Sequence, residues 1–253
     1  MATSTSTRSA RPKLIGGAGT LERLVPDRVH MGETTGRDTL ELHLSRYEFA
    51  ARHARPTRLL DISCGVGYGT RLLVDRCPEI RQAVGVDIDE SSVAYARQRY
   101  ASPKTKFLAC DCMKFEDEPF DTIVSLETIE HLRQPAAFVA RLASLLRADG
   151  VIIASVPTTP SVDGNPHHLH DFSESSFRRL FEPHGLVEVA CHRQSQPFNP
   201  IRVLSNAEAR TNDVRRNLGA WYMRHPGSLA RRVMSTLRHG FVNRYATIVW
   251  RKG

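Results

Sequence analysis

Residues 61–69 read DISCGVGYG, and this stretch decides the fold. An apolar run, RLL at 58–60, leads into it, and the apolar residues of TRLLVDRC at 70–77 then recur at helical spacing. Glycines between a strand and a helix let the backbone turn tightly and come close to a ligand. The stretch therefore predicts a strand, a ligand-binding turn and a helix, and a single turn of this kind needs support from the rest of the chain.

The flanking sequence alternates between buried strands and helices. Helices are expected at 38–53, 70–77, 89–101, 136–150 and 173–185, with Asp89 able to cap the third. Strands are expected at 58–63, 83–88, 106–111, 120–127, 150–157, 186–193 and 245–250. Strands that are apolar throughout and alternate with helices indicate a parallel sheet buried on both faces, and hence an α/β fold.

The expected domain organisation is simple. Residues 1–28 are small, polar and basic, which is typical of a disordered tail, and residues 29–253 are expected to form one domain. The segment 195–244 breaks the alternation and is too long for a hairpin, so it predicts a partly helical insertion before the last strand. Such an insertion could cover the site or form the contact of a homodimer.

Composition limits the classes of protein. No apolar run approaches the length of a membrane span, and the five cysteines include no CxxC pair, which predicts free thiols in a reducing, cytoplasmic setting. The formal net charge is +8. Residues 178–253 hold 14 Lys and Arg against 4 Asp and Glu, whereas residues 1–177 hold 21 against 23. A basic last third can attract nucleic acid, anionic lipid or a phosphorylated substrate, or it can be a solvated face.

Four successive strands end in an acidic residue. These residues are Asp61, Asp87, Asp111 and Glu127. Ligands of parallel sheets bind at the carboxyl ends of the strands, where Asp87 could accept hydrogen bonds from two ribose hydroxyls. The loop lacks both GxGxxG and Gly-Lys-Ser/Thr, so neither a dinucleotide nor a nucleoside triphosphate is well provided for.

These motifs closely resemble those of the class I S-adenosylmethionine-dependent methyltransferases. The acidic residue followed by GxGxG matches residues 61–69, and the resemblance covers residues 56–193 and 245–250. It implies a doubly wound, Rossmann-like sheet of seven strands with an antiparallel last strand, and S-adenosylmethionine as methyl donor. The cofactor-binding residues that it implies are Asp61, Ser63, Gly65, Gly67, Asp87, Ile88, Asp111, Cys112 and Leu126.

The stretch SLETIEHLRQP at 125–135 follows the fourth strand and carries two carboxylates and an imidazole. If a helix begins there, Glu127, Glu130 and His131 lie on one face of it, and two oxygens with one nitrogen suit a divalent cation such as Mg²⁺. The alternative is a purely structural role, in which His131 packs against the cofactor or holds the loop. Glu130 and His131 are also expected to act in catalysis.

A second histidine-rich loop follows the fifth strand and must emerge at the same edge. The pattern Glu-x-x-Glu-His followed by this loop resembles the metal site of small-RNA 3′-terminal 2′-O-methyltransferases, which implies His168 as a further ligand. Ubiquinone-pathway O-methyltransferases have a similar motif. His170 is the candidate general base, and Asp171 is expected to orient it.

A cation and histidines favour an oxygen acceptor, because a weakly acidic hydroxyl needs activation whereas methyl transfer itself needs mainly alignment. The expected function is O-methylation of a small molecule, foremost a sugar or oligosaccharide, by resemblance to bacterial methyltransferases of polysaccharides. The alternatives are an RNA 2′-O-methyltransferase, a methyltransferase of a quinone, natural-product phenol or amine, and a non-catalytic protein that binds the cofactor.

Overall fold

The computed structural model describes residue 26, residues 34–200 and residues 217–252, with side chains from residue 37 onward in the first helix. The predicted tail at 1–28 lies outside the described residues apart from residue 26, and so does the part of the predicted insertion at 201–216. None of the helices in the described ranges is long and apolar enough to cross a membrane.

A single seven-stranded sheet organises the described chain, in the order β3-β2-β1-β4-β5-β7-β6. The strands are β1 (Arg58–Ile62), β2 (Gln82–Asp87), β3 (Thr105–Ala109), β4 (Phe120–Leu126), β5 (Leu146–Pro157), β6 (Leu186–Pro197) and β7 (Val242–Lys252). β1 to β5 pair in parallel, whereas β7 runs antiparallel to both β5 and β6. The predicted fold class, with its antiparallel last strand, is confirmed.

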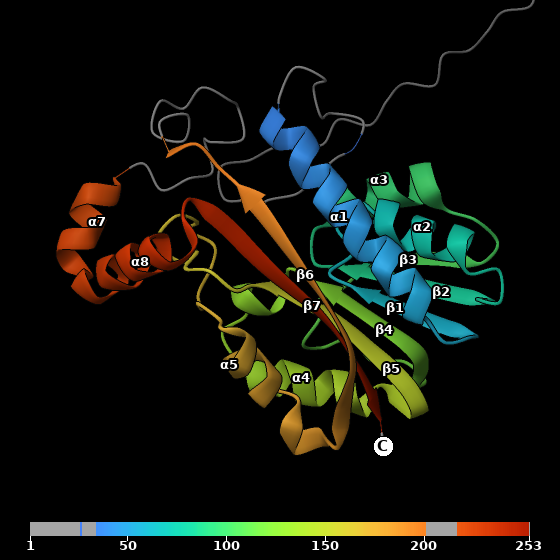
Figure 1. The fold of residues 1–253 in the computed structure, drawn as a ribbon. Coiled ribbons are helices and arrows are strands. Elements are labelled where there is room, and N and C mark those ends of the chain that lie inside the picture. Colours follow the sequence, from blue (N-terminus) through green and yellow to red (C-terminus); the bar gives the residue numbers. More distant parts are fainter. Residues whose placement is uncertain (1–25, 27–33, 201–216, 253) are drawn as a thin grey trace, which may run out of the picture.

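Helices cover both faces of the sheet (Figure 1). They are α1 (Thr34–His53), α2 (Tyr68–Arg76), α3 (Glu90–Tyr100), α4 (Pro135–Ser144), α5 (Glu174–Arg179), α7 (Leu218–Arg224) and α8 (Pro226–His239). Alternate residues of a strand point to opposite faces. Leu59 of β1 accordingly packs in a core with α1 and α2, while Leu60 packs in a second core with α4 and α5.

Several element boundaries differ from the sequence-based expectation, among them the ends of α4 and β3. α4 ends at Ser144 instead of continuing to Gly150, because Leu145 and Leu146 are buried beside Phe120 at the start of β4 and β5 begins there. β3 ends at Ala109, so Cys110 to Cys112 lie in the loop after it. Asp89 caps α3 as predicted, since its side chain accepts a hydrogen bond from the Ser92 amide.

The order of the strands reverses between β1 and β4. β1 pairs with β2 on one side and with β4 on the other, so the loops that follow β1 and β4 leave toward opposite faces of the sheet. A crevice opens at such a switch point, at the carboxyl ends of the strands, and this is where ligands of doubly wound sheets bind. The fold therefore brings the Gly-rich loop, the ends of β2 and β3 and the SLETIEH segment to one edge.

The described part of the predicted insertion at 195–244 is mainly helical. β6 extends to Pro197 and β7 begins at Val242, so both ends of the predicted segment belong to the sheet. Between them lie α7 and α8, which project beyond the end of the sheet at the left of Figure 1.

Candidate functional site

The Gly-rich loop has several residues with positive φ, and its glycines serve different purposes, one for packing and one at open space. Ser63, Gly65 and Gly67 all adopt positive φ, and the amides of Ser63 and Cys64 donate to the Val86 carbonyl. A Cβ on Gly67 would approach Ala96 to 2.7 Å, so that glycine is needed for packing. A Cβ on Gly65 would meet no protein atom within 4 Å, so Gly65 borders open space at the carboxyl edge.

Asp61 lies beneath this loop and is almost fully buried. Its carboxylate accepts a hydrogen bond from Thr70 Oγ1 at 2.6 Å and contacts the Tyr47 hydroxyl at 3.4 Å. Burial outweighs these two donors and raises the pKa of Asp61 to about 7. The structure thus places Asp61 where it joins β1 to α1 and α2, below the backbone that would meet a ligand.

Asp87 and Ile88 stand at the end of β2. Asp87 Oδ2 accepts a hydrogen bond from the Gly65 amide at 2.8 Å, and Oδ1 accepts one from the Asp89 amide at 2.9 Å. This carboxylate therefore connects the end of β2 directly to the Gly-rich loop. Ile88 follows it with 62% of its surface exposed, an unusual fraction for isoleucine beside a buried strand.

The remaining predicted cofactor residues lie at the neighbouring strand ends. Asp111 is half-buried after β3, and its Oδ1 accepts from the Met113 amide at 2.9 Å. Burial raises the pKa of the adjacent Cys112 to about 12, so this side chain stays a neutral thiol. Leu126 is buried at the end of β4. The structure gathers these side chains at the edge that the sequence predicted.

Glu127 does not join the predicted metal ligands. Its φ of 49° is left-handed, and the short helix after β4 covers only Ile129–His131, so Glu127 does not share a helical face with Glu130 and His131. Glu127 Oε1 instead accepts from Ser155 Oγ at 2.7 Å and lies 3.6 Å from Arg46 Nη1. The expectation that Glu127 shares a helical face with Glu130 and His131 was wrong, because the chain turns back before the helix begins, and Glu127 lies outside the group of candidate ligands that come together.

The other three predicted ligands do come together. Glu130, His131 and His168 each offer one ligand atom, and these atoms lie within 4.8 Å of one another. Glu130 is fully buried, while the two imidazoles are half-buried and meet edge to face at 4.6 Å between ring centroids. One carboxylate and two imidazoles is a donor set that suits a divalent transition metal.

The protonation of His131 and His168 is compatible with metal binding. His131 Nδ1 lies 3.1 Å from the His167 carbonyl, which can only accept, so Nδ1 carries the proton and the lone pair of the neutral ring is on Nε2. Burial, reinforced by His131 and His167, lowers the pKa of His168 to about 3. His168 is therefore a neutral imidazole near neutral pH, as a metal ligand must be.

His170 and Asp171 do not form the predicted pair. His170 Nε2 donates to the Leu132 carbonyl at 2.9 Å, which leaves the lone pair of the neutral ring on Nδ1. Asp171 Oδ1 accepts from the amides of Ser161 and Val162, and Asp171 Oδ2 lies 3.5 Å from Arg231. The expectation that Asp171 orients His170 was wrong, because Asp171 closes its own loop instead.

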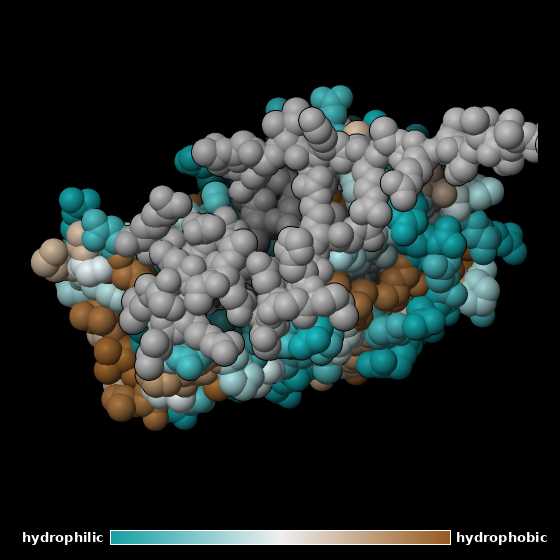
Figure 2. All heavy atoms as spheres, turned by 90° about the horizontal axis from the view of Figure 1, so that it is seen from above, coloured by the Kyte–Doolittle hydropathy of each residue, from teal (hydrophilic) through white to brown (hydrophobic). Residues whose placement is uncertain are grey.

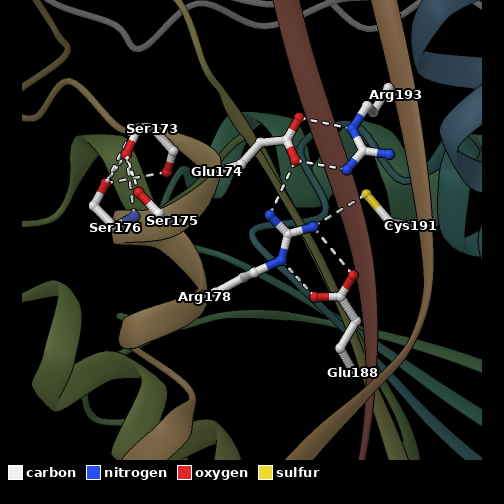
Figure 3. A network of polar contacts seen from close by, with 8 residues as sticks. All are labelled: Ser173, Glu174, Ser175, Ser176, Arg178, Glu188, Cys191 and Arg193. Carbon is white, nitrogen blue, oxygen red and sulfur yellow. Dashed lines mark hydrogen bonds and ion pairs between the residues drawn. The ribbon is translucent and has the colours of Figure 1, made fainter.

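The histidine loop is anchored from outside the sheet. Asp163, which is 1% exposed, accepts hydrogen bonds from Arg232 of α8 at 2.7 and 2.5 Å and from the Tyr222 hydroxyl of α7 at 2.6 Å. Figure 3 shows the second anchor, beyond the end of the loop, where Glu174 and Arg178 of α5 pair with Arg193 and Glu188 of β6. Hydrogen bonds from Arg193 and Arg178 lower the pKa of Glu174 to about 2.

Several residues that shape this edge could not be predicted from local sequence patterns. Tyr47, Arg46, Ser155 and Asp163 belong to none of the motifs from which the site was predicted. A buried Arg46 that donates to Gln194 at 2.7 Å and lies over the Tyr245 ring at 4.3 Å depends on partners almost 150 residues and more away. Nothing local distinguishes it from the other arginines of the chain.

A cavity of about 500 Å³ lies at the opposite edge of the sheet. Its lining comes from the start of β1, β4 and β5 and the end of β7, and consists of Arg55, Pro56, Asp121, Arg147, Ala148, Asp149, Gly150 and Arg251. None of the motif residues contributes to it. The candidate site is thus the carboxyl edge, where the chemistry-bearing side chains gather.

Comparison with known proteins agrees with this geometry. Residues 60–154 match a family described as a methyltransferase domain. A Mycobacterium tuberculosis protein named a probable S-adenosylmethionine-dependent methyltransferase is 31% identical over 156 residues, which is 58% of this chain and 55% of that protein. A ubiquinone biosynthesis O-methyltransferase of Neisseria meningitidis is 30% identical over 149 residues, or 55% of this chain and 60% of that enzyme. The chain thus matches a little over half the length of these curated relatives.

A solved structure supports the fold. The crystal structure of BH2331 from Bacillus halodurans C-125, a protein assigned as a methyltransferase, superposes with a TM-score of 0.65 at 16% identity. The match covers 83% of this chain and 97% of that one. At this identity the likeness concerns the arrangement of the sheet and helices alone.

Proposed function

We propose that this chain is a class I, S-adenosylmethionine-dependent methyltransferase and that it transfers the methyl group of that cofactor to a hydroxyl oxygen of a small molecule; the match to a methyltransferase domain and the similar proteins support this. A sugar or oligosaccharide is the proposed acceptor, and a divalent cation is proposed to assist on the acceptor side. The observation that carries the proposal is the meeting of the Gly-rich loop, Asp87 and the Glu130–His131–His168 cluster at one edge of the sheet.

The proposed cofactor site is built around Asp87 and the Gly-rich loop. Each Asp87 oxygen accepts one backbone amide, which fixes the carboxylate beside the Gly-rich loop, and a carboxylate at this position can accept the hydrogen bonds of ribose hydroxyls. The exposed Ile88 offers an apolar surface to a planar base, and Asp111 offers an acceptor for its amino group. Open space at Gly65 admits the ligand, while Ser63, Gly67, Cys112 and Leu126 shape the walls and Asp61 holds the loop from below.

Glu130, His131 and His168 are the proposed cation ligands. The neutral state of His168 and the lone pair on Nε2 of His131 fit this role, as does a buried carboxylate that would balance part of the cation's charge. A bound divalent cation would lower the pKa of a coordinated hydroxyl and fix its oxygen. The chain's own part is to hold that cation next to the cofactor side, through the short helix after β4 and the loop after β5.

His170 is the proposed general base. Its Nε2–H is committed to the Leu132 carbonyl, so the proton of the acceptor hydroxyl would be taken by Nδ1. Methyl transfer is a displacement at the sulfonium carbon, in which the new oxygen–carbon bond forms as the sulfur–carbon bond breaks. Alignment of the oxygen by the acceptor-side residues and removal of its proton are then the enzyme's two contributions.

Two kinds of support favour oxygen as the acceptor atom. The proposed cation cluster suits hydroxyl activation. In addition, a malonyl-[acyl-carrier protein] O-methyltransferase and a ubiquinone biosynthesis O-methyltransferase are 33% and 30% identical to this chain over the parts that match. The choice of a sugar is supported by the sequence resemblance to polysaccharide methyltransferases.

The proposal is tested by methyl transfer from labelled cofactor to pooled acceptors, with and without a chelator. Mannosides and glucosides represent the proposed class, and catechols, an RNA oligonucleotide and small amines represent its rivals. Alkali-stable ether label on a sugar that disappears with chelator, and returns with added cation, would support every part of the proposal. Label on RNA or an amine, or transfer to a sugar that ignores the chelator, would overturn the acceptor class or the cation respectively.

A further inference from the structure

Helix α8 presents an apolar stripe to the outside of the molecule. Leu229, Val233 and Leu237 recur every four residues and share one face of the helix, with Met234 beside them. Each of the four is exposed, and Leu237 is 77% exposed. Met223 at the end of α7 is 81% exposed, and Phe241 just beyond α8 is exposed as well. Figure 2 shows brown side chains gathered at this left end of the molecule, where Figure 1 places α7 and α8.

The opposite side of α8 is occupied by the protein itself. Ser228 is buried, and Arg232, one turn further on, forms the bidentate contact with Asp163 that anchors the histidine loop. The Arg231 side chain lies 3.5 Å from Asp171. The orientation of α8 about its own axis is thus fixed by two ion pairs, and the apolar stripe is held outward as a consequence.

The segment that carries the stripe has charged side chains of one sign. Residues 217–252 contain seven Lys and Arg and no Asp or Glu. Arg224 at the end of α7 and Arg238 beside Leu237 are exposed, so cationic groups border the apolar side chains. An amphipathic helix with an apolar face, an arginine fringe and a low overall hydrophobicity has the composition of a helix that lies in the interface of an anionic membrane.

We propose that the α7–α8 face, defined by Met223, Arg224, Leu229, Val233, Met234, Leu237, Arg238 and Phe241, docks on the surface of an anionic lipid bilayer. The apolar stripe would enter the boundary between headgroups and acyl chains, and Arg224 and Arg238 would meet lipid phosphates. A second copy of this chain fits less well, because a two-fold contact would bring the same acid-free, basic segment against itself. The inference does not depend on the proposed methyl transfer.

The test is co-sedimentation of the full chain with vesicles. Phosphatidylcholine vesicles that contain phosphatidylglycerol are compared with pure phosphatidylcholine vesicles, at low and high salt. The wild-type chain is expected to bind the anionic vesicles at least about tenfold more tightly, with weaker binding at high salt. Met234→Gln/Leu237→Gln and Arg224→Gln/Arg238→Gln are each expected to lower the affinity about tenfold or more.

Matched controls lie elsewhere on the surface. Val187→Thr/Val189→Thr removes exposed apolar side chains of β6, and Arg81→Gln/Lys106→Gln removes exposed cations near β2 and β3. Both pairs are expected to bind vesicles as the wild type does. Failure of the wild-type chain to bind anionic vesicles, or equal binding by the α8 variants, would overturn the proposal. Sedimentation velocity that shows a dimer lost on Met234→Gln/Leu237→Gln would assign the face to self-association instead.

Discussion

Arg46 of α1 lies 3.6 Å from the Glu127 carboxylate that follows β4, with the arginine 1% exposed and the glutamate 16% exposed. The pair joins the helix before the sheet to the turn after β4, and it holds Glu127 apart from Glu130, His131 and His168. A buried charge that loses its partner costs several times more than an exposed one, so this contact has measurable consequences.

Arg46→Met is expected to lower the free energy of unfolding by about 3–5 kcal/mol, since it leaves the Glu127 carboxylate without its cation and removes the Gln194 hydrogen bond. Adding Glu127→Gln to it should restore about 1–2 kcal/mol, because the stranded charge disappears. Urea unfolding of the two single variants and the double variant measures the coupling. Strictly additive effects would show that the two charges do not interact.

Glu130 and Glu127 are predicted to differ in their effect on cation binding. Glu130→Gln should weaken Mn²⁺ binding by about tenfold to a hundredfold, whereas Glu127→Gln should change it by less than about threefold. Manganese titration followed by electron paramagnetic resonance gives both affinities on proteins of the same fold. Equal losses in the two variants would return Glu127 to the ligand set.

Gly65 and Gly185 form a matched pair, because both have a left-handed φ and a Cβ on either would meet no atom within 4 Å. Gly65→Ala and Gly185→Ala each place a Cβ on a left-handed residue, and each should cost about 1–2 kcal/mol of stability. Only Gly65 borders the proposed cofactor site, so only Gly65→Ala should weaken S-adenosylhomocysteine binding, by about tenfold or more. Calorimetric titration of both variants decides the point, and unchanged affinity in Gly65→Ala would place the cofactor elsewhere.

Asp61 makes stability depend on pH in an unusual direction. Its pKa of about 7 lies above the ordinary value of 3.8, so between these pH values the folded chain holds a proton that the unfolded chain has released. This contribution to stability is complete below pH 4 and is lost as the pH rises through 7. Asp61→Asn removes the dependence, so its stability relative to the wild type should rise by a few kcal/mol from pH 4 to pH 8.

Thermal or urea unfolding across that range is the measurement, with the exposed Asp75→Asn as control. A difference between Asp61→Asn and wild type that stays constant with pH would show that Asp61 is ionised throughout.

The sheet was predictable because each strand carries its own signal. Apolar runs that end in Asp or Glu, separated by helical periodicity, are local patterns, and they placed β1, β2 and β4 within one residue at each end. The cofactor edge follows from that topology, since parallel strands end together.

The acceptor side was less predictable because its geometry depends on single backbone angles. Helical spacing put Glu127 on the same face as Glu130, but a left-handed φ at Glu127 turns the side chain toward Arg46 and Ser155. His168 was placed correctly beside His131, whereas Asp171 was not placed beside His170. Which of several neighbouring carboxylates faces a histidine is decided by loop packing against α8, and no periodic pattern encodes it.

Calorimetric titration of S-adenosylhomocysteine into the wild-type chain and Asp87→Ala tests the central claim most directly, namely that the carboxyl edge around Asp87 is the cofactor site. The account predicts one site per chain in the wild type and a loss of affinity of about a hundredfold in Asp87→Ala, because two hydrogen bonds to a charged acceptor and the tie to Gly65 are removed. The exposed Asp75→Asn should bind as the wild type does. Absence of binding to the wild-type chain, or equal affinity in Asp87→Ala, would contradict the account.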